Sequence, residues 1–400
     1  MRTRFLHSAI LVALLLASAG AQTMGRIGRS HFGSASSGGV VEAGSKPSWR
    51  LIAANDPVKD ERQLAAAAYD APTNSLIVFA GTNSTALTND IRSLSSANGI
   101  GNGSWSIVIP NGAFGSPTAR IAPTAVYDTA NSRMIVFGGC TGDFCTAVQN
   151  DVWVLTDANG QSGAPTWIQL TPAGLPPAPR YLHSAAYDPV NNRMIIYGGE
   201  NLLKLFSDTW VLSNANGLGG TPTWTQLSPS GGPPQGRSLP TIVYDPTSNS
   251  LIEFAGVSTS TVAANATNSV WTLSHANGLG GAPVWTNTIA DGAAGSPPKR
   301  YGHLAYYDSA NNCMMIFGGG ANTSTGFPEL DDVWVLTNAN GVGSKPQWNK
   351  LNIGGTLPIR REWLVGGYDA ANNRMMIYGG ASEEGIFVST WVLTHANGRP

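Results

Sequence analysis

The sequence carries little charge. Only 12% of its 400 residues are Asp, Glu, Lys or Arg, the formal net charge is −1, and no block of like charge occurs along it. A surface that binds nucleic acid needs clustered Lys and Arg to meet the phosphates. The composition excludes such a surface, and we predict no nucleic-acid partner.

The sequence also lacks a hydrophobic run long enough to span a membrane, which takes about 20 apolar residues. Its N-terminal apolar run covers only residues 5–16 and follows Arg2 and Arg4. Two small-x-small patterns come next, at residues 17–19 and 19–21. This order is typical of a secretory signal peptide. We predict that residues 1–21 are cleaved and that the mature protein is secreted or periplasmic.

Cysteine is scarce, with three residues in the chain. Cys140 and Cys145 fall in one short predicted loop, and the oxidising environment of an exported protein favours a local disulfide there. The alternative is half of a metal site, but no second Cys or His pair completes it. Cys313 stands alone and receives no role. A disulfide between Cys140 and Cys145 or two free thiols is therefore expected; the disulfide is the candidate, and we predict no metal and no cofactor.

Turn-forming residues are abundant instead. The chain has 48 Gly and 25 Pro beside a hydrophobic content of 42%. Because Gly, Pro, Asn and Asp favour turns, this composition indicates many short strands. Residues 22–46 are rich in Gly and Ser without any hydrophobic period, and we predict a flexible segment there.

One motif recurs six times, and its third copy reads RYLHSAAYDPVNNRMIIYGG at residues 180–199. Every copy has a Tyr-Asp pair, an Arg seven residues before the Tyr, and a Gly eleven residues after the Asp. The six Arg are Arg62, Arg120, Arg180, Arg237, Arg300 and Arg361, and the six Tyr are Tyr69, Tyr127, Tyr187, Tyr244, Tyr307 and Tyr368. Such a repeat indicates a solenoid, a propeller or an array.

Four strands can be placed in each copy. The first strand ends in Tyr-Asp, the second is apolar on consecutive positions, the third carries Trp in most copies, and the fourth carries another Trp. An Ala-Asn-Gly turn joins the last two strands, and Asn-Gly is a strong hairpin signal. A strand that is apolar on both faces is covered on both faces. The pattern therefore predicts an all-β fold, a six-bladed β-propeller over residues 47–400.

The two ends of the repeat array predict how the ring closes. The last copy ends after its Ala-Asn-Gly turn and lacks a fourth strand, whereas residues 46–53 read KPSWRLIA before the first copy begins. Trp49 stands thirteen residues before Arg62, as Trp167, Trp224 and Trp348 stand before their own Arg. We therefore predict that the N-terminal strand completes the last blade.

These units resemble the Kelch repeat, because a first strand opened by Arg, a second strand ending in Gly-Gly and a Trp downstream form its pattern. The six-unit array is similar to the central domain of galactose oxidase and covers about residues 47–400. Ala80-Gly81 and Ala255-Gly256 depart from Gly-Gly, and Arg92 stands where other copies have the third-strand Trp. The resemblance implies the propeller fold.

Loop lengths separate two faces of the predicted ring. The turns between strands one and two and the Ala-Asn-Gly turns keep nearly constant lengths, so they share one face, the constant face. The remaining connections vary in length and emerge on the opposite, variable face, at about residues 82–90, 140–150, 200–207, 257–268, 320–331 and 381–389. Loops that differ on a regular scaffold usually carry function.

Candidate ligand-binding residues lie where the copies differ, near the Arg of each unit. Arg can bind carboxylates bidentately, but an Arg present in every copy favours a structural role between neighbouring blades. The candidates at the predicted channel mouth are Arg180, Tyr181, His183, Arg300, Tyr301, His303, Glu362 and Trp363. Two His residues without a third donor make a weak metal site, so packing is the favoured role for His183 and His303.

The sequence favours an exported binding module for protein or carbohydrate that acts through the variable face. No Gly-x-Ser-x-Gly, His-Glu-x-x-His, P-loop or dinucleotide fingerprint is present, so binding is favoured over catalysis. Two alternatives stay open. The resemblance extends to galactose oxidase and a six-bladed sialic acid epimerase, which implies a carbohydrate-active enzyme of the epimerase, mutarotase or oxidase type. A structural envelope or matrix protein is the other, and a monomer is expected.

Overall fold

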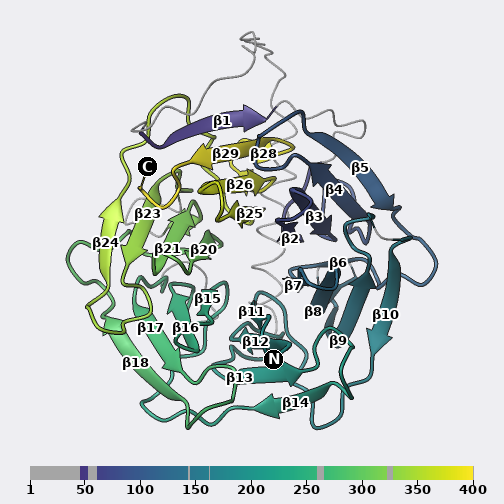
Figure 1. Cartoon of the computed structure of the whole chain (residues 1–400), viewed down its shortest axis with the longest axis horizontal. Helices are drawn as coiled ribbons and strands as arrows, with labels where there is room; N and C mark the ends of the chain where they lie inside the picture. The colour runs from purple at the N-terminus through teal and green to yellow at the C-terminus, as the bar shows by residue number, and fades with distance from the viewer. Residues whose placement is uncertain are drawn as a thin grey trace.

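The computed structural model describes residues 46–52, 61–142, 145–161, 163–258, 265–321 and 328–399. The predicted signal peptide and the Gly- and Ser-rich segment up to residue 45 lie outside these residues. Within the described residues all regular structure is β-strand, arranged as six blades around a central axis (Figure 1). No helical segment among them is long and apolar enough to cross a membrane. The predicted all-β six-bladed propeller is confirmed.

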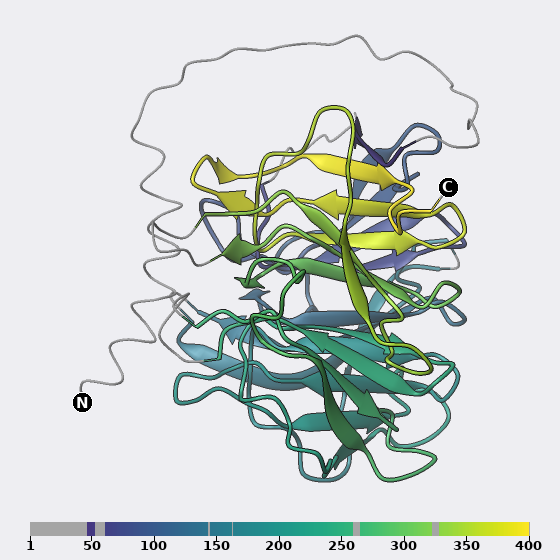
Figure 2. The ribbon, with the colours of Figure 1, turned by 90° about the vertical axis from the view of Figure 1, so that its left-hand side faces the viewer.

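Each blade is an antiparallel sheet of four strands, and the first strand of each blade lies nearest the centre of the ring. Blade 1 is β2 (Ala66–Asp70), β3 (Ser75–Phe79), β4 (Ile91–Ser95) and β5 (Ser104–Ile109); blade 2 is β7 (Thr124–Asp128), β8 (Arg133–Thr141), β9 (Ala147–Thr156) and β10 (Thr166–Leu170); blade 3 is β11 (Ser184–Asp188), β12 (Arg193–Tyr197), β13 (Thr209–Ser213) and β14 (Thr223–Gln226). Figure 2 shows the ring edge-on, with the strands running between its two faces.

The other three blades repeat this order. Blade 4 is β15 (Thr241–Asp245), β16 (Ser250–Phe254), β17 (Val270–Ser274) and β18 (Val284–Ile289); blade 5 is β20 (Leu304–Asp308), β21 (Cys313–Phe317), β23 (Val333–Thr337) and β24 (Gln347–Lys350); blade 6 is β25 (Val365–Asp369), β26 (Arg374–Tyr378), β29 (Thr390–Thr394) and β1 (Ser48–Ile52). Short strands on the variable face are β6 (Arg120–Ile121), β19 (Arg300–Tyr301), β22 (Gly320–Ala321), β27 (Ala381–Ser382) and β28 (Gly385–Ile386).

The fourth-strand Trp explains how neighbouring blades pack. Each of these rings contacts an aromatic residue of the second strand of the preceding blade, with centroids 4.4–5.3 Å apart. The pairs are Trp105 with Tyr378, Trp167 with Phe79, Trp224 with Phe137, Trp285 with Tyr197, Trp348 with Phe254, and Trp49 with Phe317. The second strands are buried on both faces, as their apolar sequence predicts.

Strand β1 closes the ring as predicted. It pairs antiparallel with β29 over five residues, from Ser48 opposite Thr394 to Ile52 opposite Thr390, and it forms the outer edge of blade 6 (Figure 1). Its Trp49 is buried against Phe317 of blade 5. The first strand of the described chain therefore occupies the place of the fourth strand that the last repeat lacks.

The constant face is held by a ring of side-chain hydrogen bonds between blades. The Asn of each Ala-Asn-Gly turn donates from Nδ2 to the Asp of the Tyr-Asp pair in the preceding blade, at 2.6–2.9 Å. The pairs are Asn98 with Asp369, Asn159 with Asp70, Asn216 with Asp128, Asn277 with Asp188, Asn340 with Asp245, and Asn397 with Asp308. Two of the most regular sequence features thus serve contacts between blades.

Candidate functional site

The six first strands surround the centre of the ring (Figure 1). A cavity of about 250 Å³ lies between them, in the predicted central channel. The cavity is lined by residues 64–67, 122–125, 182–185, 239–242, 302–306 and 363–366. These are the beginnings of the first strands and the residues just before them. Since the first strands begin at the variable face, the cavity occupies that end of the channel. We call it the channel mouth.

Six residues with left-handed backbone conformation form the rim of the channel mouth. Each stands two positions after the Arg of its unit, with φ between 50° and 61°: Leu64, Ala122, Leu182, Leu239, Gly302 and Trp363. Such angles are unfavourable for Leu and Trp. Hydrogen bonds between neighbouring rim residues offset that cost, since Leu239 N–H donates to the Leu182 carbonyl (2.9 Å) and Trp363 N–H donates to the Gly302 carbonyl (3.0 Å).

His183 and His303 lie at the channel mouth, where they join neighbouring blades. His183 Nε2 shares a hydrogen bond of 2.8 Å with the hydroxyl of Thr124 in the preceding blade, and His303 does the same with Thr241. Each ring also packs edge-on against a Phe of that blade. Burial, followed by the charge of the nearby Arg, holds both imidazole pKa values well below the usual range. Both rings are therefore neutral.

The described residues contain no group of three or more His, Cys, Asp or Glu side chains placed to hold a metal ion. The hydroxyl of Ser184, another group that lines the channel mouth, donates to the Pro240 carbonyl of the next blade. The hydroxyl groups of Thr124, Thr241 and Ser184 in the lining are thus bonded within the protein, between one blade and the next. The Nδ1 atoms of His183 and His303 are buried without a hydrogen-bond partner among the described residues.

The guanidinium groups of Arg180 and Arg300 turn away from the channel mouth. Arg180 donates to the Gly198 carbonyl at 3.0 Å and to both carboxylate oxygens of Asp208 at 2.7 and 3.0 Å, all within blade 3. Arg300 bonds Asp332 of blade 5 in the same way, at 2.8 and 3.1 Å. Both Arg are fully buried. Their side chains therefore stabilise the interior of their own blades, and the geometry does not favour them as ligand-binding groups.

The contact of these Arg residues with neighbouring blades is made by the backbone. The carbonyl of Arg180 accepts a 2.9 Å hydrogen bond from the N–H of Gly139 in the preceding blade, and Arg300 accepts one of 3.0 Å from Gly256. The predicted structural role of these Arg residues therefore has two parts, since the side chain bonds within its own blade and the backbone carbonyl bonds to the preceding blade. The acid partners of the side chains lie in connections of unequal length, so the sequence did not identify them.

Tyr181 and Tyr301 are buried beside carboxyl groups on the variable face. Tyr181 is bridged through its backbone to Glu200. Burial raises the pKa of Glu200 to about 7, and a hydrogen bond from Tyr181 opposes this shift. Tyr301 pairs with Gly320, and its hydroxyl lies against the Cα of that glycine together with the Glu362 carboxyl, so that a Cβ on Gly320 would collide with both. Gly320 thus permits the close approach of Tyr301 and Glu362.

Glu362 is the most perturbed carboxyl group of this region. The residue is only 7% exposed, and its Oε2 is buried without a hydrogen-bond partner among the described residues. Burial raises the pKa of Glu362 well above its usual range, and the negative charge of Glu329 raises it further. Both effects favour the protonated form of the Glu362 carboxyl group. The structure brings together the predicted candidates Tyr301 and Glu362, between blades 5 and 6.

This burial gives an expected dependence of stability on pH. The folded state binds a proton at Glu362 in a range where the unfolded state, with a carboxyl pKa of about 4.3, has lost it. Stability should therefore fall as pH rises above the unfolded-state pKa of about 4.3 and through the raised pKa of the folded state. Over this range, the free energy of unfolding should fall by at least about 1 kcal/mol less in Glu362→Gln than in the wild type, as measured by thermal unfolding. Equal losses in both proteins would show that Glu362 ionises normally.

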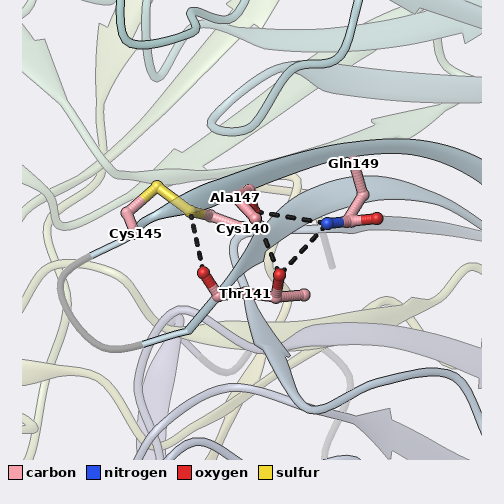
Figure 3. The surroundings of a disulfide bond; sticks show 5 residues. All are labelled: Cys140, Thr141, Cys145, Ala147 and Gln149. Carbon is pink, nitrogen blue, oxygen red and sulfur yellow. Dashed lines mark hydrogen bonds between the residues drawn. A yellow bond between two sulfur atoms is a disulfide. The ribbon is translucent and has the colours of Figure 1, made fainter.

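An apolar cluster covers one side of the channel mouth. Its buried members are Leu64, Ile121, Ala122, Cys140, Cys145 and Tyr181, with Leu182 and Trp363 packed against them. A disulfide joins Cys140 to Cys145 at the end of the β8–β9 hairpin (Figure 3). Where a loop was expected at residues 140–150, the two strands continue past a register shift at Phe137 and Gly139. Thr141 and Gln149 are hydrogen-bonded across the hairpin at 3.1 Å (Figure 3).

Comparison with known proteins agrees with this architecture. The model of the KLHDC2/KLHL20/DRC7 Kelch-repeats domain matches residues 41–243. The chain is 28% identical over 259 residues to the leucine-zipper-like transcriptional regulator 1 homolog of Drosophila melanogaster, covering 63% of this chain and 23% of that protein. It is 26% identical over 281 residues to the multiple epidermal growth factor-like domains protein 8 of Homo sapiens, covering 69% of this chain and 9% of that protein.

A third relative is the dynein alpha chain of the flagellar outer arm of Chlamydomonas reinhardtii. It is 31% identical over 173 residues, which cover 41% of this chain and 4% of the dynein chain. The chain thus spans less than a quarter of the length of these relatives. Among solved structures, YjhT aligns with a TM-score of 0.60 and 16% identity, covering 84% of this chain and 95% of that one. At this identity the likeness shows a shared fold.

Proposed function

Because the chain belongs to the KLHDC2/KLHL20/DRC7 Kelch-repeats family, we propose that it is an exported binding module that holds an apolar side chain of a partner protein in the channel mouth. The observation that carries the proposal is the lining of this cavity of about 250 Å³. Its rim presents Leu64, Leu182, Leu239 and the indole of Trp363. A concave apolar site with a few polar groups is the usual form of a binding pocket.

The chemistry of the lining supports a protein ligand over a sugar. A sugar carries several hydroxyl groups, each of which loses a hydrogen bond to water on binding and needs a protein partner in return. The hydroxyl groups of Thr124, Thr241 and Ser184 already bond to His183, His303 and Pro240. An aliphatic or aromatic anchor needs no such partner, and anchors of this kind dominate the energy of protein interfaces.

Two observations support export. The N-terminal 21 residues have the order of basic, apolar and small residues that signal peptides have. The bond between Cys140 and Cys145 fits a compartment in which disulfides persist. N-terminal sequencing of the protein recovered from its own host would test this part directly, and an intact Met1 would contradict it.

The rim offers a substitution that removes its apolar surface without opposing the fold. Leu182→Asn combined with Leu239→Asn loses the apolar contacts of both side chains, but Asn adopts the left-handed conformation more readily than Leu, so most of the melting temperature should be retained. Peptides selected from a displayed random library on the wild-type protein should bind this double variant at least about 30-fold more weakly. Binding can be measured by titration calorimetry or surface plasmon resonance.

The matched control changes two Leu of the same blades on the constant face, Leu218→Asn and Leu279→Asn. Both are half-exposed and follow the Ala-Asn-Gly turns. Peptide affinity should be unaffected in this control, and equal binding by both double variants would place the peptides outside the channel mouth. A glycan array tests the alternative ligand. If glycans bind the wild type and do not bind the rim variant, the ligand of the channel mouth is a carbohydrate and not a protein.

A further inference from the structure

Four blades share a compact arrangement of an Arg, an Asp and, in three of them, a Trp. In blade 3, Asp208 accepts hydrogen bonds from Arg180 Nη1 (2.7 Å), Arg180 Nη2 (3.0 Å) and Trp210 Nε1 (2.7 Å). Blades 2 and 5 repeat these contacts with Asp151 and Asp332. In blade 1 the Asp is Asp90, whose carboxylate accepts hydrogen bonds from Arg62 and Arg92. The carboxylate neutralises a guanidinium group that is buried in the blade.

Blades 4 and 6 have Ser at the position of this Asp. Blade 4 still provides a counter-charge, because Glu253 of β16 lies 3.2 Å from Arg237 Nη1 while Ser269 accepts a bond from Nη2. Glu253 stands opposite Trp271 in the strand register, and the corresponding residue of blade 6, opposite Trp391, is Ile377. Blade 6 therefore has neither the Asp of the other blades nor the Glu of blade 4.

The consequence is a buried cation without a carboxylate partner. Arg361 is 1% exposed and donates to the carbonyls of Ile359 and Gly379 at 2.9 Å each and to Ser389 Oγ at 3.2 Å. Within the described part of the chain, no Asp or Glu forms an ion pair with it. Burial lowers the pKa of Arg361 to about 10. A guanidinium group at such depth is normally paired with an acid.

Blade 3 shows what blade 6 is missing. Phe206 covers Arg180 and Phe387 covers Arg361, each with the guanidinium carbon 4.2 Å from the ring centroid. Trp391 Nε1 points at Ser389 Oγ at 3.3 Å, as Trp210 Nε1 points at Asp208. The two blades thus agree in the Arg, the Phe and the Trp and differ in Asp208 against Ser389. Blade 6 keeps the donors of the arrangement, whereas the acceptor carboxylate is absent.

We propose that this position of blade 6, the carboxylate slot formed by Arg361, Ser389 and Trp391, binds a carboxylate supplied from outside the chain. The incoming carboxylate lies beside Ser389 Oγ, adjacent to the place that the Asp208 carboxylate fills in blade 3, and it accepts hydrogen bonds from the guanidinium group, the Ser389 hydroxyl and the indole N–H. Charge-assisted bonds from Arg to a carboxylate are the strongest of this set. The inference does not depend on the channel mouth being a binding site.

Two observations place the slot near the surface. The Asp side chains that fill the same position in blades 2, 3 and 5 are 17%, 21% and 10% exposed, so the position reaches the surface of the variable face. Ser389 is itself partly exposed. The carboxylate could come from a small free acid or from an Asp, a Glu or the C-terminus of a partner, since all present the same group.

Reciprocal substitutions between blades 3 and 6 test the slot. Sodium acetate should raise the melting temperature of the wild type in a saturable manner, by about 2 °C or more, relative to sodium chloride at equal ionic strength. Ser389→Asp fills the slot from within, so it should raise the melting temperature in buffer and abolish the acetate effect. An equal acetate effect in the wild type and in Ser389→Asp would overturn the proposal.

Asp208→Ser provides the second, independent variant, because it converts blade 3 into the arrangement of blade 6. It should lose stability, and acetate should restore part of that loss on top of the effect seen in the wild type. Failure of acetate to restore any stability would show that the Arg, Ser and Trp donors do not hold a carboxylate, even if Ser389→Asp did not fold.

Two blocked tripeptides separate the sources of the carboxylate, N-acetyl-Gly-Asp-Gly-amide and the same peptide with Asn. If the Asp peptide stabilises the wild type but not Ser389→Asp, and the Asn peptide stabilises neither, the slot accepts the side chain of a partner. Stabilisation by acetate but by neither peptide supports a slot that admits only a small free acid.

Discussion

A chain that begins at residue 53, and so lacks β1, is expected to lose more than about 5 kcal/mol of unfolding free energy relative to one that begins at residue 46. Three contributions add up. Burial of Trp49 against Phe317 is lost, which alone amounts to about 3–5 kcal/mol for a Trp. The five-residue pairing with β29 is lost as well, and the exposed edge of β29 is left without a partner.

The two chains can be compared by urea denaturation followed by circular dichroism and Trp fluorescence. The chain from residue 46 retains β1 and should match the longer protein. Adding the peptide of residues 46–52 to the shorter chain should restore much of the lost stability, because the strand pairs along one open edge. Unchanged denaturation midpoints in the shorter chain would mean that blade 6 is stable with three strands and that the ring does not depend on β1.

The sequence predicted the fold through features that repeat in every blade. Tyr-Asp and Ala-Asn-Gly recur because each Asn donates to the Asp of the preceding blade, as Asn277 does to Asp188. The fourth-strand Trp recurs because it packs on the preceding blade. Its distance of thirteen residues from the next Arg, which Trp49 shares with Trp167, Trp224 and Trp348, also identified Trp49 as the closing residue. Contacts that each blade makes with its neighbour have to repeat, and they can be read from one sequence.

The candidate site could be predicted only in part. The acid partners of the Arg residues lie 28 to 32 positions away, across connections of unequal length, so no fixed spacing reveals them. One signal was available, since Asp stands two residues before the third-strand Trp in three copies, as Asp208 does before Trp210. The rim of the channel mouth gave no signal, because a left-handed backbone at Leu182 or Trp363 results from tertiary hydrogen bonds and not from local preference.

Arg300→Met is expected to lower the free energy of unfolding by about 3–5 kcal/mol, because it leaves the carboxylate of Asp332 largely buried without its cation. The nearby Asp332 pKa is held below its usual range, despite burial, by the hydrogen bonds and charge of Arg300. The adjacent residue supplies the control. Lys299 forms an ion pair with Asp291, in which both side chains are more than 40% exposed, so Lys299→Met should cost less than about 1 kcal/mol.

The double variant Arg300→Met with Asp332→Leu distinguishes a structural ion pair from a ligand-binding Arg. If the pair serves only the interior of blade 5, removing both charges should recover a large part of the stability lost in Arg300→Met, since an apolar pair no longer leaves a carboxylate unpaired. Peptide binding at the channel mouth should then persist in the double variant. Near-normal stability of Arg300→Met combined with loss of binding would instead restore Arg300 as a ligand-binding residue. The expected loss of stability in Arg300→Met and the carboxylate slot of blade 6 follow from the same geometry. In every blade except blade 6, the buried Arg is paired with a carboxylate of its own blade.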